Sequence, residues 1–245
     1  CENNGFQKYE KQSSSRDFVH NYYETSIDKD IVVVISGEIN GFYIYNTNNT
    51  YNKKYMSEYL KEVKSFGLVG IGCFEYKTNS FVGSFEHSHN LQKISMIDIP
   101  DSSKLISLGR MFINALLVND QLEKWDVSNV TSMEKLFWND KVALFNQPLN
   151  KWDVSSVTNM ADMLGHTNFN RPLKNWNVSN VTDMAGMFGY SPFNQEIDTW
   201  DVSNVKELAS MFLHAHNFNQ DISSWKINKN VNITDYQNNK HLFDD

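Results

Sequence analysis

Two pairs of histidines are the residues in this sequence whose spacing most readily suggests metal chemistry. One residue separates His87 from His89, and one residue separates His214 from His216. Zinc sites in proteins use three or four ligands, drawn from histidine, cysteine and carboxylate side chains at short spacings. Neither pair has a cysteine or a cluster of carboxylates at such a spacing. We therefore predict that these histidines lie at turns or face solvent, and that the chain has no metal site.

Catalytic chemistry would require a nucleophile, a base or a phosphate-binding loop in a recognisable pattern. Ser36-Gly37-Glu38 is only a turn, and the hydrolase, zinc-protease and cysteine-protease signatures are absent from the sequence. Paired carboxylates for glycoside cleavage have no sequence signature of their own, and nothing marks a pair here. We expect a protein that is not an enzyme and needs no cofactor, with a hydrolase in the N-terminal domain as a lesser alternative.

The two cysteines suggest different roles. Cys73 lies in an apolar stretch, residues 70–74, and is predicted to be a small buried hydrophobe. Cys1 precedes a polar segment, residues 2–16, that cannot bury enough apolar surface to fold alone. Mature bacterial lipoproteins begin in this way, so we predict a lipid on Cys1, a membrane anchor and a location on the outer face of the cell membrane. The alternatives are a disulfide between the two cysteines and an arbitrary start of the sequence.

The balance of charge bounds the class of partner. The chain carries 22 Lys and Arg against 29 Asp and Glu, a formal net charge of −7, and it has no basic block. Binding to nucleic acid requires clustered positive side chains that neutralise phosphates, so we expect no nucleic-acid partner. No apolar run approaches the roughly 20 residues that cross a bilayer, and the longest, residues 31–35, is predicted to be a buried strand.

A repeated segment fills the second half of the sequence. Its units share the form Leu/Ile-x-x-Trp-x-Val/Ile, and an earlier copy has Ile97 where the others have tryptophan. Successive tryptophans lie 24 to 27 residues apart, within the roughly 20–29 residues that are usual for leucine-rich repeats. The sequence therefore predicts six stacked units. The tryptophans are Trp125, Trp152, Trp176, Trp200 and Trp225.

Each unit divides into three predicted elements. Around the tryptophan, inward and outward side chains should alternate as in a strand, so that stacked parallel strands place the tryptophans in one buried column. The next pattern, Val-Thr-x-Met-x-x-Met, predicts a 3₁₀ or short helical turn capped by threonine. A Phe-Asn pair ends the unit, and its asparagine should satisfy backbone groups at the next turn. The threonines are Thr131, Thr158 and Thr182, and the asparagines are Asn146, Asn170, Asn194 and Asn219.

The string Trp-Asp-Val-Ser-Asn-Val-Thr-x-Met-x-x-Met-Phe, of which residues 125–137, 152–164 and 176–188 are variants, resembles the BspA-like, Treponema-pallidum-type leucine-rich repeats. It most resembles the repeated segments of mycoplasma surface lipoproteins of unknown function. The likeness covers residues 91–236 and departs from the pattern at Lys206, which replaces the threonine, and after Ile227, where the Met-Phe pair is missing. The resemblance implies surface display, adhesion or protein binding, and it implies no enzyme activity.

The expected fold is an α/β repeat, a leucine-rich-repeat-like solenoid with parallel strands, preceded by a small α+β domain. In that N-terminal domain we predict strands at 31–35, 41–45, 68–76 and 79–85, and an amphipathic helix over residues 55–66. The domain should also cover the first edge of the solenoid, because an open edge strand invites aggregation. The predicted boundaries are 1–16 for a lipid-anchored tether, 17–90 for the capping domain, 91–227 for the six units, and 228–245 for a degenerate C-terminal cap.

The outward positions beside the tryptophans form the predicted partner-binding face. Lysines and aspartates two residues apart should give a zwitterionic stripe, and solenoids commonly bind partners through such extended surfaces. The alternative is a solvated face with surface ion pairs worth only about 0–1 kcal/mol. The predicted face consists of Lys124, Asp126, Lys151, Asp153, Asn175, Asn177, Thr199 and Asp201.

These observations favour a monomeric, surface-displayed and lipid-anchored solenoid that binds an unidentified host or extracellular protein. A passive surface-coat protein whose repeats vary antigenically has the same sequence features, so a binding measurement is needed to separate the two.

Overall fold

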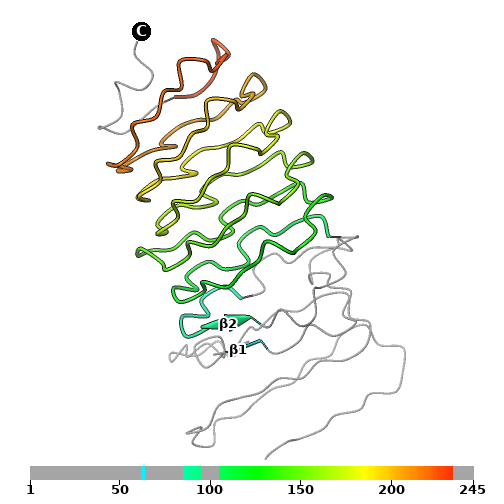
Figure 1. The fold of residues 1–245 in the computed structure, drawn as a ribbon, viewed down its shortest axis with the longest axis vertical. Coiled ribbons are helices and arrows are strands. Elements are labelled where there is room, and N and C mark those ends of the chain that lie inside the picture. The colour runs from blue at the N-terminus through cyan, green and yellow to red at the C-terminus, as the bar shows by residue number, and fades with distance from the viewer. Residues whose placement is uncertain (1–61, 64–84, 95–104, 234–245) are drawn as a thin grey trace, which may run out of the picture.

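The computed structural model describes residues 62–63, 85–94 and 105–233 of the 245-residue chain. From residue 105 onward the chain winds in successive coils, which lie on one another in chain order along the long axis of the molecule (Figure 1). We call this part the coil stack. Several predictions fall outside the described residues: those on the tether, Cys1, Cys73 and Ile97, on the strands at 31–35, 41–45 and 68–76, and on residues 234–245 of the cap.

Two short strands lie at the N-terminal end of the described chain. Strand β1, Glu62–Val63, pairs in parallel with strand β2, Lys93–Ile94. The predicted helix over residues 55–66 is therefore wrong at Glu62 and Val63. Pairing with a neighbouring segment overrides the helical spacing of apolar residues there, as tertiary context often does with local preference.

A ladder of parallel bridges joins successive coils, and one further parallel bridge joins Ala143 to Thr167. The bridges of the ladder lie in the Val-Thr-x-Met segments and the equivalent segments of the other coils, and no bridge that the described residues form includes a Trp-Asp-Val residue. The predicted position of the strands is therefore wrong. Turns explain the difference, because the amide of Trp152 bonds to the carbonyl of Leu149 and the amide of Val157 bonds to that of Val154. The ladder runs Ser107↔Ser132, Ser132↔Asn159, Asn159↔Asp183, Asp183↔Glu207 and Glu207↔Asn232.

The repeated threonines bond between coils and do not cap helices. Thr158 donates to the carbonyl of Thr131 both from its backbone N–H, at 2.8 Å, and from Oγ1, at 3.1 Å. Thr182 makes the same two bonds to Thr158. The N-cap prediction is therefore wrong. Lys206, which replaces the threonine in the next coil, keeps only the backbone bond, 2.8 Å to the carbonyl of Thr182. This coil therefore lacks the hydroxyl bond but is still bonded to the preceding coil.

Left-handed backbone positions explain why no helical turn follows the threonine. In each coil the residue before a buried Met or Leu has a φ between +54° and +62°, whereas right-handed helices need φ near −60°. For residues other than glycine this conformation costs roughly 1–2 kcal/mol. The surrounding coil contacts must therefore offset that cost. The positions are Arg110, Lys135, Asp162, Gly186 and Ser210.

The five tryptophans form one buried column, as predicted. The ring centroids of Trp176 and Trp200 are 6.4 Å apart, as are those of Trp200 and Trp225, and each pair is nearly parallel. Each indole from the second onward donates Nε1–H to a carbonyl of the preceding coil. The bond from Trp176 to Leu149 measures 3.0 Å, and those of Trp152, Trp200 and Trp225 go to Leu122, Leu173 and Ile197. The column therefore joins coils by polar bonds as well as by apolar packing.

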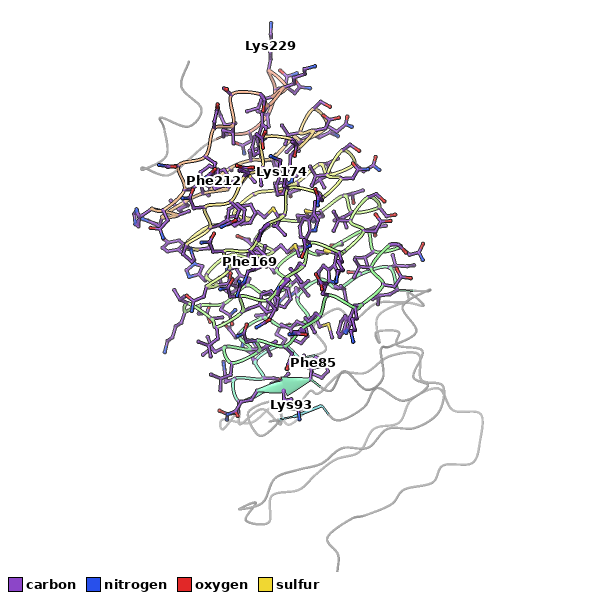
Figure 2. The ribbon with its side chains drawn as sticks, in the orientation of Figure 1. Phe85, Lys93, Phe169, Lys174, Phe212 and Lys229 are labelled. Carbon is purple, nitrogen blue, oxygen red and sulfur yellow. The ribbon has the colours of Figure 1, made fainter. Side chains whose placement is uncertain are left out.

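Phenylalanines build a second aromatic spine, which the sequence analysis does not anticipate. Phe145, Phe169, Phe193 and Phe218 stack at centroid distances of 6.1 to 6.2 Å. Phe85, Phe169 and Phe212 lie at rising levels of the stack (Figure 2). The spine extends before residue 91, because Phe85 stacks on Phe112 at 5.7 Å and its amide bonds to Met111. Residues 85–90 thus pack as part of the coil stack.

The recurring asparagines satisfy backbone groups of the neighbouring coil, and that prediction is confirmed. Oδ1 of Asn146 accepts the backbone N–H of Asn170 at 3.0 Å, and Oδ1 of Asn170 accepts that of Asn194 at 2.9 Å. The same bond joins Asn194 to Asn219. The side chains of Asn146, Asn170 and Asn194 are therefore structural, and for the side chain of Asn219 the role stays a prediction.

Candidate binding site

The eight residues of the predicted partner-binding face are all exposed. The in-and-out alternation of Trp-Asp-Val is confirmed, with Trp152 and Val154 buried and Asp153 exposed between them. The alternation arises within turns, because the aspartates bond to the serine two residues later. Oδ1 of Asp153 accepts the N–H of Ser155 at 3.0 Å, and the same bond links the pairs Asp126–Ser128, Asn177–Ser179 and Asp201–Ser203.

The charged side chains of this face interact with neighbours other than each other. Hydrogen bonds from the side chain and then the backbone of Ser155 lower the pKa of Asp153, and those from Ser203 lower the pKa of Asp201. Both carboxylates are therefore ionised at neutral pH. Lys151 pairs with Glu123 of the preceding coil at 3.0 Å, so the expected stripe of paired Lys151 and Asp153 is not what the described residues form.

A row of aromatic side chains lies on another edge of the stack. Trp138, His166, Tyr190 and His214 come from four successive coils, and we call them the aromatic ridge. The centroids of His166 and Tyr190 are 4.2 Å apart with the rings nearly parallel. Trp138 meets His166 edge-on at 5.9 Å, and His214 lies 4.6 Å from Tyr190. Tyr190 is 41% exposed, so the ridge is open to solvent.

A pocket of about 70 Å³ adjoins the ridge. Glycines accommodate the side chains that form its walls, because a Cβ at Gly186 would collide with Oδ1 of Asp162 and a Cβ at Gly165 would lie 3.1 Å from Cδ1 of Trp138. The pocket therefore exists where the repeat places small residues beside large ones. It is lined by Trp138, Asp162, Gly165, His166, Gly186, Gly189, Tyr190, Ser210 and Leu213.

Asp162 is the acid of this pocket. Burial raises the pKa of its carboxyl group, Lys135 opposes that shift, and the nearby carboxylates of Glu134 and Asp183 add to it. Nζ of Lys135 lies 3.9 Å from Oδ2 of Asp162, at the outer limit of an ion pair. The side chain of Asp162 is 35% exposed. The pocket thus holds a partly desolvated carboxylate with a distant cationic neighbour, which can accept hydrogen bonds from a positively charged group.

His166 is neutral at physiological pH. Burial lowers the pKa of its imidazole, and Asp140 only partly opposes that shift. A neutral ring adds no positive charge beside Asp162. It can therefore stack against Tyr190 without repelling a cation in the pocket.

The histidine pairs singled out from the sequence lie at turns. The rings of His87 and His89 are 5.9 Å apart, and those of His214 and His216 are 5.5 Å apart. Within the described ranges, no three His, Cys, Asp or Glu side chains come together in an arrangement that could hold a metal ion.

The aromatic ridge is the feature that sequence reasoning missed. Its signal is positional, since His166, Tyr190 and His214 follow one another at intervals of 24 residues. Aligning the units on residue type hides this row, because the members are histidine, tyrosine and tryptophan. Aligning them on position would have found the two histidines and the tyrosine, whereas Trp138 aligns with Gly165 of the next coil.

Comparison with known proteins gives one match. A family model described as "Mycoplasma protein of unknown function, DUF285" matches residues 79–191 and 141–245. No curated protein and no solved structure is significantly similar to the chain. The part of the chain that the structure describes contains no helix with the length and apolar character needed to cross a membrane.

The two matched ranges together span residues 79–245, well over half of the 245-residue chain. They confirm the resemblance to a mycoplasma family of unknown function, while the likeness to BspA-like leucine-rich repeats stays a prediction. The chain belongs to the mycoplasma protein family of unknown function DUF285.

Proposed function

We propose that this protein is displayed on the cell surface, where its coil stack binds a protein outside the cell. One observation carries the proposal: equivalent positions of successive coils expose their side chains above a continuous buried core. Such a surface is extended and rigid, and repeat proteins use surfaces of this kind to bind other macromolecules. Within this proposal the stack is a leucine-rich-repeat-like solenoid, and the resemblance to surface-lipoprotein repeats supports the location.

The binding face in this proposal is the predicted one, which includes Asp126, Asp153 and Asp201. Their carboxylates are exposed, each on a separate coil, and each is fixed by a hydrogen bond to its own serine. A fixed side chain loses less conformational entropy when it binds than a mobile one does. The negative charges would suit a partner with a complementary positive surface.

The test compares capture of host-cell proteins by the immobilised full chain and by a variant with Asp126→Asn, Asp153→Asn and Asp201→Asn. Asparagine keeps the turn, because Asn177 makes the same bond to Ser179. We expect a specific protein, identified by mass spectrometry, to be captured by the wild type and lost with the variant. Asp221→Asn is the matched control, since Asp221 has the same kind of turn with Ser223 but lies outside this face.

Equal capture by wild type and triple variant would show that the face is wrong. If the wild type captures nothing specific, the binding function fails and a passive surface coat becomes the better explanation. The location has a separate test, in which intact cells are treated with protease and the cleaved peptides are identified. Complete protection of the protein would contradict surface display.

A further inference from the structure

We propose that the pocket beside the aromatic ridge receives the guanidinium group of an arginine side chain from a partner protein. This inference rests on the proposed function and adds to it a specific contact outside the predicted face. The residues that carry it are Asp162, Trp138, His166 and Tyr190, together with Gly186 of the next coil.

The size of the pocket limits its occupant. Its volume is about 70 Å³, whereas sites for drug-sized small molecules measure roughly 300–1,000 Å³. A nucleotide or a sugar chain has no room there. The charged end of one side chain matches the space, and the remainder of a partner protein would then lie on the surrounding surface.

The charges around the pocket favour a cation. Asp162 lines it, and Glu134 and Asp183 are close enough to raise the pKa of Asp162. Lys135 lowers that pKa, but its Nζ stays 3.9 Å from the carboxylate. An arriving guanidinium could approach to normal hydrogen-bond distance and offset the desolvation of the carboxylate more fully.

The aromatic wall favours arginine over lysine. Guanidinium is planar and weakly hydrated, stacks on aromatic rings and bonds to a carboxylate through two parallel N–H groups. Lysine presents a compact ammonium that holds its water more strongly. Trp138, His166 and Tyr190 line the pocket together with Asp162, so that both halves of arginine recognition are present in one place.

The pocket depends on a departure from the repeat. The residues equivalent to Asp162 in three other coils are Arg110, Lys135 and Ser210. In the coil that directly follows Asp162, the equivalent residue is Gly186. Because Gly186 has no side chain, the carboxylate of Asp162 occupies the space where a Cβ would otherwise lie. Among the described coils, the combination of an acidic residue at this position and a glycine at the same position of the next coil occurs at Asp162 and Gly186.

The experiment titrates the isotope-labelled full chain with Nα-acetylarginine methylamide and follows the backbone amide signals of Gly165, Gly186 and Gly189 by NMR. The neutral analogue Nα-acetylcitrulline methylamide has nearly the same shape without the charge. We expect saturable shifts with the arginine probe and binding about tenfold weaker with citrulline, which corresponds to about 1.4 kcal/mol. The lysine analogue should also bind more weakly than arginine.

Two variants assign the effect to the pocket. Asp162→Asn should weaken arginine binding by about tenfold, and it should fold, because asparagine tolerates the φ of +54° at this position. Lys135→Asn removes the competing cation and should tighten binding a few-fold, at about the strength of a surface ion pair. Asp221→Asn, which lies outside both the pocket and the predicted face, should leave the affinity unchanged.

Equal binding of the arginine and citrulline probes, or unchanged binding to Asp162→Asn, overturns the proposal. So do absent shifts at the three glycines, and so does a lysine probe that binds as tightly as arginine. These failures are distinct from failure of the proposed function. If the immobilised chain still captures its partner while the arginine probe does not bind, only the pocket assignment is lost.

Discussion

The tryptophan column and the aromatic ridge are both rows of rings, but they differ in what varies along them. Inside the stack the same residue recurs in every unit from Trp125 to Trp225, each buried and most bonded to the preceding coil. On the ridge the residue changes from His166 to Tyr190 to His214 at one structural position, and Trp138 joins the row from the position that Gly165 has in the next coil. Uniform positions therefore build the stack, and variable positions give each coil its own surface chemistry.

The largest difference between the two rows should appear in stability when a ring is removed from the column. Trp176→Ala should lower the free energy of unfolding by roughly 3–5 kcal/mol, because it leaves a cavity and removes one of the two hydrogen bonds that the carbonyl of Leu149 accepts. Tyr190→Ala on the exposed ridge should cost far less. Urea denaturation of both variants provides the measurement, and equal losses would show that the two rows do not differ in structural role.

The next largest effect on stability should come from replacing Gly186, beside which the carboxylate of Asp162 lies. Gly186→Ala should cost about 2 kcal/mol, from the left-handed φ of +62° and from the collision with Asp162. In an Asp162→Gly background the collision disappears and only the backbone cost, about 1 kcal/mol, should remain. A double-mutant cycle followed by thermal denaturation measures the difference, and strictly additive losses would exclude the collision.

The period and the buried column could be predicted because apolar residues recur in phase in every unit. The strands were misplaced because in-and-out burial is not unique to strands. Here two tight turns bury Leu149, Trp152 and Val154 while the hydrogen-bonded bridge forms later, at Asn159. Sequence alternation reports which side chains are buried, and it leaves open which backbone groups pair.

The left-handed positions and the pocket could not be predicted for a different reason. Arg110, Lys135, Asp162 and Ser210 share a backbone conformation, but they are two cations, an anion and a hydroxyl, and none is a residue type that favours left-handed backbone as strongly as glycine and asparagine do. The contacts between coils impose that conformation, so no preference of the residues themselves signals it. The binding pocket inherits this difficulty, because it arises from the relation of Asp162 to Gly186 one coil later.

The hydroxyl bonds between threonines of successive coils should have a smaller effect on stability. Thr158→Val keeps the shape of the side chain but removes the hydroxyl bond to the carbonyl of Thr131, at a cost of roughly 0.5–1 kcal/mol. Lys206→Thr should gain a similar amount, because it restores the missing bond to Thr182. Chemical denaturation of the two variants checks these opposite signs, and two losses would show that the hydroxyl bonds do not join the coils.

The smallest expected effect is the dependence on pH of Asp162→Asn. Burial raises the pKa of Asp162 above 3.8, so between its unfolded and folded pKa values the native state binds more protons than the unfolded state. The stability of the wild type therefore falls as the pH rises through that window.

Removing the carboxyl group should make the variant more stable, relative to the wild type, at neutral pH than at pH 3. The expected difference is a few tenths of a kcal/mol, since solvent screens a side chain that is 35% exposed. The preference of asparagine for left-handed backbone adds a gain that does not change with pH, so the slope of the stability difference against pH is the quantity to measure. A slope of zero would mean that the carboxylate is fully compensated within the chain, and the pocket would then have no reason to attract a cation.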